Sequence, residues 1–169
     1  MPDYTYFPNG VQVDPGAGVG LKRTGQTKKI NAGGKVGATA GWTTNNNLSA
    51  YRVPASQTAV TLTIPVSEVK KGWVLTGFRV LGQIESGGNT VTLDADLRKT
   101  TAAAADLTDA SIGAITQISK TADYKITDTK TGLSATVADD EAYYVLLTAT
   151  TGIATDIDLQ GIELFYDEY

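Results

Sequence analysis

The sequence predicts an all-β protein: an antiparallel β-sandwich that carries an extended, mostly non-regular N-terminal arm. Three observations lead to this prediction. From residue 57 onward, apolar and polar residues alternate in short runs rich in β-branched and aromatic side chains, as in half-buried strands. Turn residues separate these runs, and none shows the 3.6-residue period of an amphipathic helix. The first third of the chain holds four of the five prolines and half of the 18 glycines.

Residues 1–56 are expected to form the arm. Proline fixes φ and lacks a backbone donor, and glycine disfavours regular structure, so this segment is not expected to build a core of its own. Apolar side chains are nonetheless spaced along it, as in segments that become ordered against a partner. The alternative is an arm that folds back onto its own domain. We prefer partner binding, with the anchors Tyr4, Tyr6, Phe7 and Trp42.

The net charge of −4 hides an asymmetry along the chain. Residues 1–56 carry six basic and two acidic side chains, which gives +4, whereas residues 57–169 carry eight basic and sixteen acidic ones, which gives −8. A basic segment on an acidic body suits docking onto an acidic protein surface, although scattered lysines on a solvated arm give the same count. Nucleic acid is not an expected partner. The docking residues would be Lys22, Arg23, Lys28 and Lys29.

Residues 57–169 are expected to form the sandwich. Strands are predicted at residues 58–64, 74–84, 91–98, 115–119, 124–127, 143–150 and 157–166. Pro65 is expected to interrupt the first strand because it cannot donate to a sheet ladder, Gly132 to mark a turn, and Gly161 to bulge the last strand. Residues 100–109 fit one helical turn or a long loop. Long strands with unequal loops favour a jelly roll over an immunoglobulin-like order.

The sequence contains no histidine and no cysteine. This removes the Ser-His-Asp and Cys-His nucleophiles, the usual zinc ligands and disulfides. No apolar run approaches the roughly 18–20 residues that cross a bilayer, and the first residues lack the basic and apolar regions of a secretory signal. We therefore expect a protein that is not an enzyme, needs no cofactor or metal, has no membrane partner and carries no signal peptide.

Two acidic pairs are the features closest to a chemical site. Asp94 with Asp96, and Asp156 with Asp158, each occupy one face of a predicted strand, with Cβ atoms about 6.5–7 Å apart. Such a pair can help to bind Ca²⁺ or act as acid and base in glycoside hydrolysis. Charges that alternate with apolar residues are also typical of a solvent-facing sheet, which is the preferred interpretation. Strand aromatics could stack on sugars or pack in the core: Trp73, Tyr124, Tyr143, Tyr144 and Tyr166.

Four segments of the domain carry a resemblance: GFRVLGQIESGGNTVTLDADLRKTT (77–101), DASIGAITQIS (109–119), YYVLLTATT (143–151) and TDIDLQGIELFY (155–166). In style they resemble the jelly-roll cement, or decoration, proteins of tailed bacteriophages. The resemblance implies a virion structural protein on the capsid exterior, made in the host cytoplasm. It would bind the major capsid protein and itself, with a homotrimer expected and arms that reach neighbouring subunits.

Other functions remain open at this point. The main alternative is a tail-fibre or host-recognition jelly roll that binds surface glycans. A glycosidase or lyase that relies on carboxylates alone, and a bacterial surface-layer protein, are less favoured because no substrate-cleft motif and no signal peptide are found.

Overall fold

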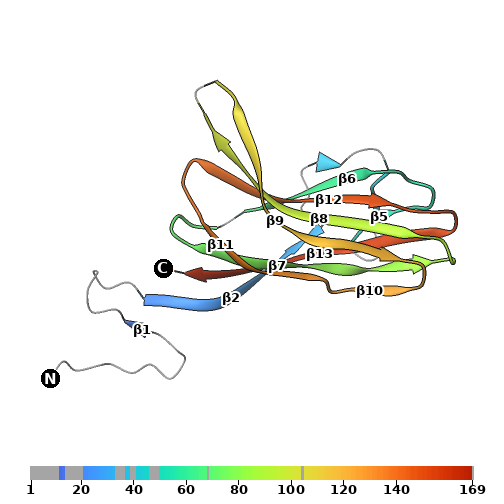
Figure 1. The fold of residues 1–169 in the computed structure, drawn as a ribbon, viewed down its shortest axis with the longest axis horizontal. Coiled ribbons are helices and arrows are strands. Elements are labelled where there is room, and N and C mark those ends of the chain that lie inside the picture. Colours follow the sequence, from blue (N-terminus) through green and yellow to red (C-terminus); the bar gives the residue numbers. More distant parts are fainter. Residues whose placement is uncertain are drawn as a thin grey trace.

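The computed structural model describes residues 12–13, 21–32, 37–38, 41–45, 50–67, 69–103 and 105–168. Within these ranges the chain forms strands and no α-helix (Figure 1). The strands are β1 (Gln12–Val13), β2 (Leu21–Asn31), β3 (Gly37–Ala38), β4 (Thr43–Asn45), β5 (Ala50–Val53), β6 (Val60–Val66), β7 (Val74–Ser86), β8 (Val91–Ala102), β9 (Leu107–Lys120), β10 (Tyr124–Ile126), β11 (Thr129–Thr136), β12 (Glu141–Thr150) and β13 (Thr155–Glu168). A search of the described residues finds no helix suited to cross a membrane.

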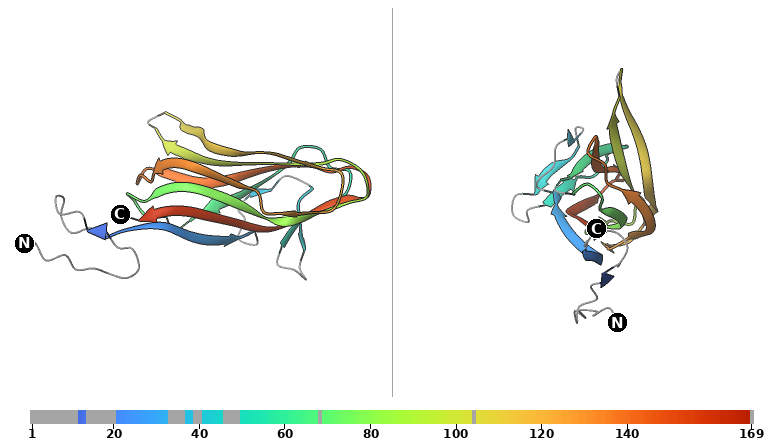
Figure 2. Two further views of the ribbon diagram at one scale, coloured as in Figure 1. Left: turned by 60° about the horizontal axis from the view of Figure 1, so that its bottom comes forward. Right: turned by 90° about the vertical axis from the view of Figure 1, so that its left-hand side faces the viewer.

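Two antiparallel sheets form a β-sandwich, which confirms the predicted fold class (Figures 1 and 2). The larger sheet is built around the long pair of β7 and β13. Strands β10 and β11 pair with the other side of β7, while β2 and β5 pair with the other side of β13 and lead on to β1 and β4. The smaller sheet has the order β3-β6-β12-β8-β9.

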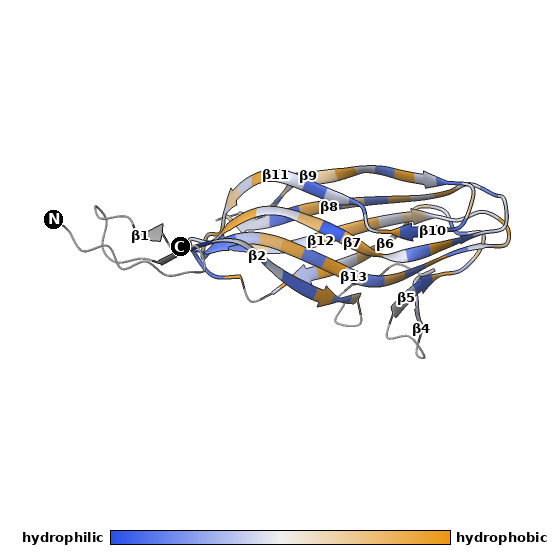
Figure 3. Ribbon diagram, turned by 90° about the horizontal axis from the view of Figure 1, so that it is seen from below, coloured by the Kyte–Doolittle hydropathy of each residue, from blue (hydrophilic) through white to orange (hydrophobic). Residues whose placement is uncertain are grey.

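The core lies between the facing sides of the two sheets, where every second residue of a strand points. In β6, buried and partly exposed residues alternate without a break from Val60 to Val66. Figure 3 shows the same alternation as orange and blue segments along β7 and β13. The largest fully buried side chains include Phe78, Leu62, Ile64, Leu75, Ile84, Leu93, Leu97, Leu147, Ile157 and Ile162.

Three local expectations are corrected by the strand pairing. Pro65 does not interrupt β6, which runs on to Val66 and pairs with β12 through Tyr144 opposite Pro65. Among the described residues, position 65 has a strand partner on the β12 side alone, and a proline is tolerated where its missing N–H faces no strand. Gly132, with φ of +74°, lies inside β11 at a shift of register rather than in a turn between elements. The described residues of the range 100–109 contain no helical turn, and most of them belong to the β8–β9 hairpin.

Gly161 is confirmed as a bulge. The register between β13 and β7 shifts between Leu159 and Gly161. A Cβ atom at Gly161 would lie 2.2 Å from the backbone oxygen of Ile30, so β2 approaches β13 more closely here than any side chain permits. The absence of a side chain at Gly161 therefore allows β2 to pair closely with β13.

The predicted boundary at residue 56 does not separate an arm from the sandwich. Strand β2 pairs with β13 from Gly161 opposite Asn31 to Tyr166 opposite Gln26, and β5 pairs with β13 around Arg52. This part of the segment is integrated because its spaced apolar residues enter the sandwich core, namely Ala32, Trp42, Tyr51 and Val53. The anchors Tyr4, Tyr6 and Phe7 lie outside the described residues.

Candidate functional site

Trp42, predicted to fill a pocket on a partner, fills one in its own domain. Its side chain is only 7% exposed, and the indole Nε1 donates a hydrogen bond to the backbone oxygen of Val60 at 3.1 Å. An indole that is buried and hydrogen-bonded in the core is not free to bind another protein. The prediction for Trp42 is therefore corrected. The short apolar runs near Trp42 in the sequence do not indicate whether its side chain packs in its own domain or against a partner.

The basic residues predicted to dock on an acidic surface lie on β2: Lys22, Arg23, Lys28 and Lys29. The side chain of Lys22 is outside the described residues. Arg23 lies 4.0 Å from the carboxylate of Glu168, and Lys29 is the register partner of Glu163. Arg23 thus has an acidic neighbour on β13 of its own chain, and the docking of these basic residues on a partner stays a prediction. Arg23 remains 61% exposed, so its pair with Glu168 contributes little stability.

The hairpin of β8 and β9 projects from the sandwich (Figures 1 and 2). The first five residues of β9 are all exposed, and Leu107, the first of them, is 73% exposed. Since an exposed leucine on a projecting element can enter an apolar pocket without rearranging the fold, the hairpin is a candidate contact element.

A cluster of polar side chains braces this hairpin. Arg98 donates from Nη1 to Asp96 at 2.6 Å and from Nη2 to Asp109 at 2.7 Å. Tyr144 on β12 donates its hydroxyl to Asp109 at 2.6 Å. Arg98 and Tyr144 together hold the pKa of Asp109 below its usual value. The cross-links fix the direction in which the hairpin leaves the sheet.

The first acidic pair is held by neighbouring strands. Asp94 accepts two hydrogen bonds of 3.0 Å from Gln117 on β9. Asp96 accepts one of 2.6 Å from Ser111 in addition to the bond from Arg98. These contacts favour the interpretation of a solvent-facing sheet, in which the carboxylates stabilise the β8–β9 pair.

The second acidic pair belongs to a cluster of three carboxylates. One oxygen each from Glu85, Asp156 and Asp158 lies within 4.8 Å of the others. Arg52 on β5 donates to Asp158 from Nε at 2.8 Å and from Nη2 at 2.6 Å, and its Nη1 lies 3.6 Å from Asp156. The two partners Arg52 and Asp158 are 106 residues apart in the sequence. No local pattern could therefore reveal their contact.

Burial and the charge of Arg52 have opposite effects on the pKa of Asp156. Burial raises the pKa of Asp156 above its usual value, although Arg52 opposes the shift. The hydrogen bond that Arg52 donates to Asp158 raises the pKa of the guanidinium. Three carboxylates can in principle hold a cation, but the bidentate guanidinium already supplies the positive charge that Asp158 needs. The cluster therefore fits a structural ion pair better than an acid–base pair.

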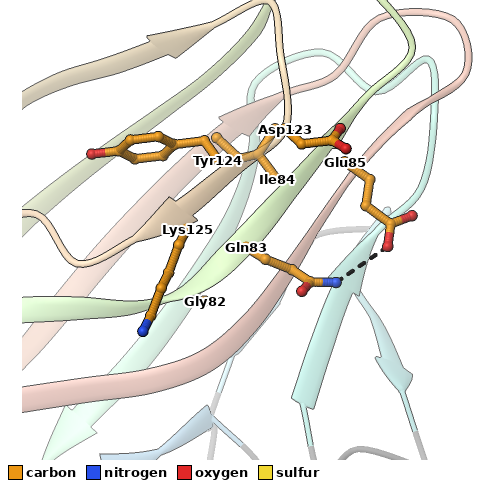
Figure 4. A pocket seen from close by; sticks show the side chains of 7 residues that line it. All are labelled: Gly82, Gln83, Ile84, Glu85, Asp123, Tyr124 and Lys125. Atoms are coloured by element: carbon orange, nitrogen blue, oxygen red, sulfur yellow. Dashed lines mark hydrogen bonds between the residues drawn. The ribbon is translucent and has the colours of Figure 1, made fainter.

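An open depression of about 490 Å³ lies beside this cluster, between β7 and β10 (Figure 4). Its polar lining includes Gln83, Glu85, Asp123 and Lys125. Gln83 donates to Glu85 at 3.2 Å, and Lys125 lies opposite Gln83 in the register. The depression offers donors and acceptors for a hydroxyl-rich ligand. Sequence reasoning missed Gln83 and Lys125 because only the pairing of β7 with β10 brings them together.

Tyr124 is the aromatic residue among those that line this depression, and a single ring is not a stacking platform. The ring of Tyr124 points away from Gln83 and Glu85 (Figure 4), and the ammonium group of Lys120 lies 4.0 Å from its centre. Tyr143 is buried. Trp73 and Tyr166 stack on each other with centroids 4.5 Å apart. Core packing and mutual contacts therefore occupy these rings.

Comparisons with known proteins give a similarity of fold. No protein-family model and no curated protein matches the sequence. The structure is similar to the C-terminal CBM6 of LamC, a marine laminarinase from Zobellia galactanivorans, with 11% identity and a TM-score of 0.47 over 83% of this chain and 99% of that one. It is also similar to the CBM22-1–GH10 modules of xylanase 10B from Clostridium thermocellum, with 12% identity and a TM-score of 0.46 over 85% of this chain and 28% of that one. Similarity at this level does not identify a function.

Proposed function

We propose that this chain is a non-enzymatic virion structural protein that binds the outside of an icosahedral phage capsid and bridges capsid subunits. One observation carries the proposal. The large hydrophobic side chains that are exposed in the described part of the chain are Leu107 and Ile153, at 73% and 74%. Leu107 begins β9 in the projecting hairpin, and Ile153 lies in the β12–β13 connection at the opposite end of the sandwich (Figure 1).

Contacts at two opposite ends suit a protein that bridges two neighbours. Two linked contacts bind more tightly than either alone, provided that both can be made at once. The sandwich between them sets their separation, and the Arg98 cross-links keep the hairpin in one direction. The polar clusters of the chain are engaged within the fold, as the bidentate pair of Arg52 with Asp158 illustrates. Tyr4, Tyr6 and Phe7 remain predicted anchors for the capsid contact.

The test is co-sedimentation with empty shells assembled from the major capsid protein of the same genome. We expect the wild-type chain to pellet with the shells and Leu107→Asp to bind at least about 30-fold more weakly, the loss of a hot-spot contact of about 2 kcal/mol. Thr116→Asp is the matched control, because Thr116 is exposed on the same strand. A wild-type chain that stays in the supernatant contradicts the proposal.

A second candidate function is recognition of surface glycans, as in a host-recognition jelly roll. The polar depression beside β10 favours it, since amide, carboxylate and ammonium groups can all hydrogen-bond sugar hydroxyls. A glycan array distinguishes the two functions. Selective binding of one sugar that is lost in Gln83→Ala and Lys125→Ala variants would favour recognition of glycans. A cement protein should bind no sugar selectively.

A further inference from the structure

Strand β9 lies at the end of the smaller sheet, whose order is β3-β6-β12-β8-β9. One edge of β9 pairs with β8, and no other strand in the described part of the chain pairs with its second edge. A strand in this position presents a row of unpaired N–H and C=O groups with which another strand can pair. The chemistry of this second edge therefore suits an extended partner.

The half of β9 that follows Ser111 is protected from such pairing. It lies against β11, since a Cβ atom at Gly113 would lie 2.6 Å from the side chain of Leu133. The register between β9 and β8 also shifts twice in this half. A covering element and β-bulges are two common ways in which proteins prevent an edge strand from pairing with another chain.

Within the described ranges, the half of β9 in the projecting hairpin lacks both protections (Figure 1). Residues 107–111 pair with residues 98–102 in continuous register, and all five are exposed. They include no proline and no lysine, the residues that most often guard an edge. The edge of β2, by contrast, contains Lys28 and Lys29. We call the backbone edge of residues 107–111 that faces away from β8 the open edge.

The charge around the open edge favours a basic partner. Asp109 is its charged residue, and the carboxylate remains 43% exposed although Arg98 and Tyr144 both donate to it. Residues 57–169 as a whole carry a net −8. A strand with basic side chains is therefore attracted, and an acidic strand is repelled. The bonds to Asp109 also hold the hairpin in one orientation before binding, which lowers the entropy lost on association.

A second copy of β9 fits the open edge poorly. Antiparallel pairing of residues 107–111 with the same residues of another copy places Asp109 opposite itself, and like charges directly opposite each other destabilise a sheet. The strand that β9 already accepts differs in this respect. Residues 98–102 of β8 begin with Arg98 and Lys99 and place Thr100 opposite Asp109.

We propose that the open edge accepts an extended, basic strand from another protein, which pairs backbone to backbone with residues 107–111. The inference rests on the proposed function for the identity of that protein, because the strand would belong to a capsid subunit. Main-chain hydrogen bonds give affinity in this mode of recognition, and side-chain contacts give specificity. Leu107, at the end of the open edge, supplies such a side-chain contact.

The test is solvent-exchange NMR of single amides in the full-length chain, with a peptide as the probe. The peptide has the sequence of residues 97–102, Leu-Arg-Lys-Thr-Thr-Ala, and blocked ends. Successive N–H groups of an antiparallel strand point to opposite sides, so every second amide of residues 107–111 faces the open edge. We expect these amides to exchange freely in the isolated chain and at least about fivefold more slowly with about 10 mM peptide, which corresponds to a dissociation constant of at most about 2.5 mM.

Two controls accompany the probe. The same peptide with proline in place of both threonines lacks two backbone donors and should leave exchange unchanged. The amides of residues 24–30 on β2 are the matched internal control, because β1 pairs with β2 only at Leu21 and Lys22 among the described residues. They should keep their exchange rates, since the lysines of β2 repel a basic strand.

No slowing at the open edge, or equal slowing on β2, would overturn the inference. So would full protection of residues 107–111 in the isolated chain, because the chain itself would then cover the edge. Hydrogen exchange of the chain bound to capsid shells separates the two proposals. Shells that bind without protecting residues 107–111 contradict the inference alone, whereas slowing by the peptide in a chain that ignores shells contradicts the proposed function alone.

Discussion

Removing residues 1–56 tests how this chain divides into arm and domain. The truncation deletes β2 and β5, which pair with β13 along much of its length. A second truncation, of residues 1–11 only, leaves all described strands in place. If residues 1–56 were an independent arm, the two truncated proteins would have equal stability. The pairing instead predicts that they differ greatly.

The expected loss in the free energy of unfolding follows from the side chains that the longer truncation removes from the core. Trp42, Tyr51 and Val53 are buried, and burying a large apolar side chain contributes about 1.5–3 kcal/mol, so together they contribute about 5–9 kcal/mol. Asp158 is 5% exposed and would lose its partner Arg52, which costs about 3–5 kcal/mol for an uncompensated buried charge. The truncation also removes β5 from beside Asp158, so water can solvate this carboxylate and its cost is not added to the core loss. The loss of about 5–9 kcal/mol from the core alone is comparable to the whole stability of a domain, about 5–15 kcal/mol.

Urea unfolding monitored by circular dichroism measures both truncations. We expect the protein without residues 1–11 to unfold cooperatively at the wild-type midpoint. The protein without residues 1–56 should show no cooperative transition, because its native state is no longer favoured in water. A cooperative transition at the wild-type midpoint for residues 57–169 alone would refute the reasoning and restore the boundary at residue 56.

Three further predictions concern single residues. Arg52→Met should lower the free energy of unfolding by about 3–5 kcal/mol, because the buried carboxylate of Asp158 loses the positive charge of Arg52; urea titration measures it, and a loss below about 1 kcal/mol contradicts it. Burial raises the pKa of Tyr143 from 10.0 to about 12, so the unfolded phenol ionises first and stability falls as pH rises from 10 to 12, by up to about 2.7 kcal/mol. Tyr143→Phe should lose that part of the slope, and an unchanged slope refutes it. Gly161→Ala should destabilise by about 1–3 kcal/mol by pressing on the oxygen of Ile30, and a wild-type melting temperature would disprove that contact.

The strands of the sandwich were predictable because their signal is local. Alternation from Val60 to Ile64 or from Val91 to Leu97 follows directly from one buried face, and Gly161 marked its bulge inside such a run. Strand β2 lacks this signal, because its residues are mostly exposed and it is held by backbone pairing with β13 more than 100 residues away. A basic, glycine-containing strand with mostly exposed residues therefore looks like an arm in the sequence.

The candidate contact residues also depend partly on local sequence and partly on contacts between distant segments. The lack of histidine and cysteine is a property of composition alone, and it points away from chemistry that uses these side chains. Leu107 and Ile153 could not be singled out, because Leu and Ile are more often buried than exposed. Their exposure depends on where the hairpin leaves the sheet and on how the β12–β13 connection is held by hydrogen bonds to residues 54–59 and 87–90. Trp42 gave the opposite error, since a spaced aromatic residue in a glycine-rich segment turned out to be core.

Quantitative mass spectrometry of purified virions tests most directly whether this chain is a structural protein of a phage capsid. If the proposed function holds, a phage encodes the chain, and virions of that phage are the sample. The proposed function predicts a fixed ratio of this chain to the major capsid protein that persists through density-gradient purification. Absence from the virions, or a ratio that falls with each purification step, would contradict it.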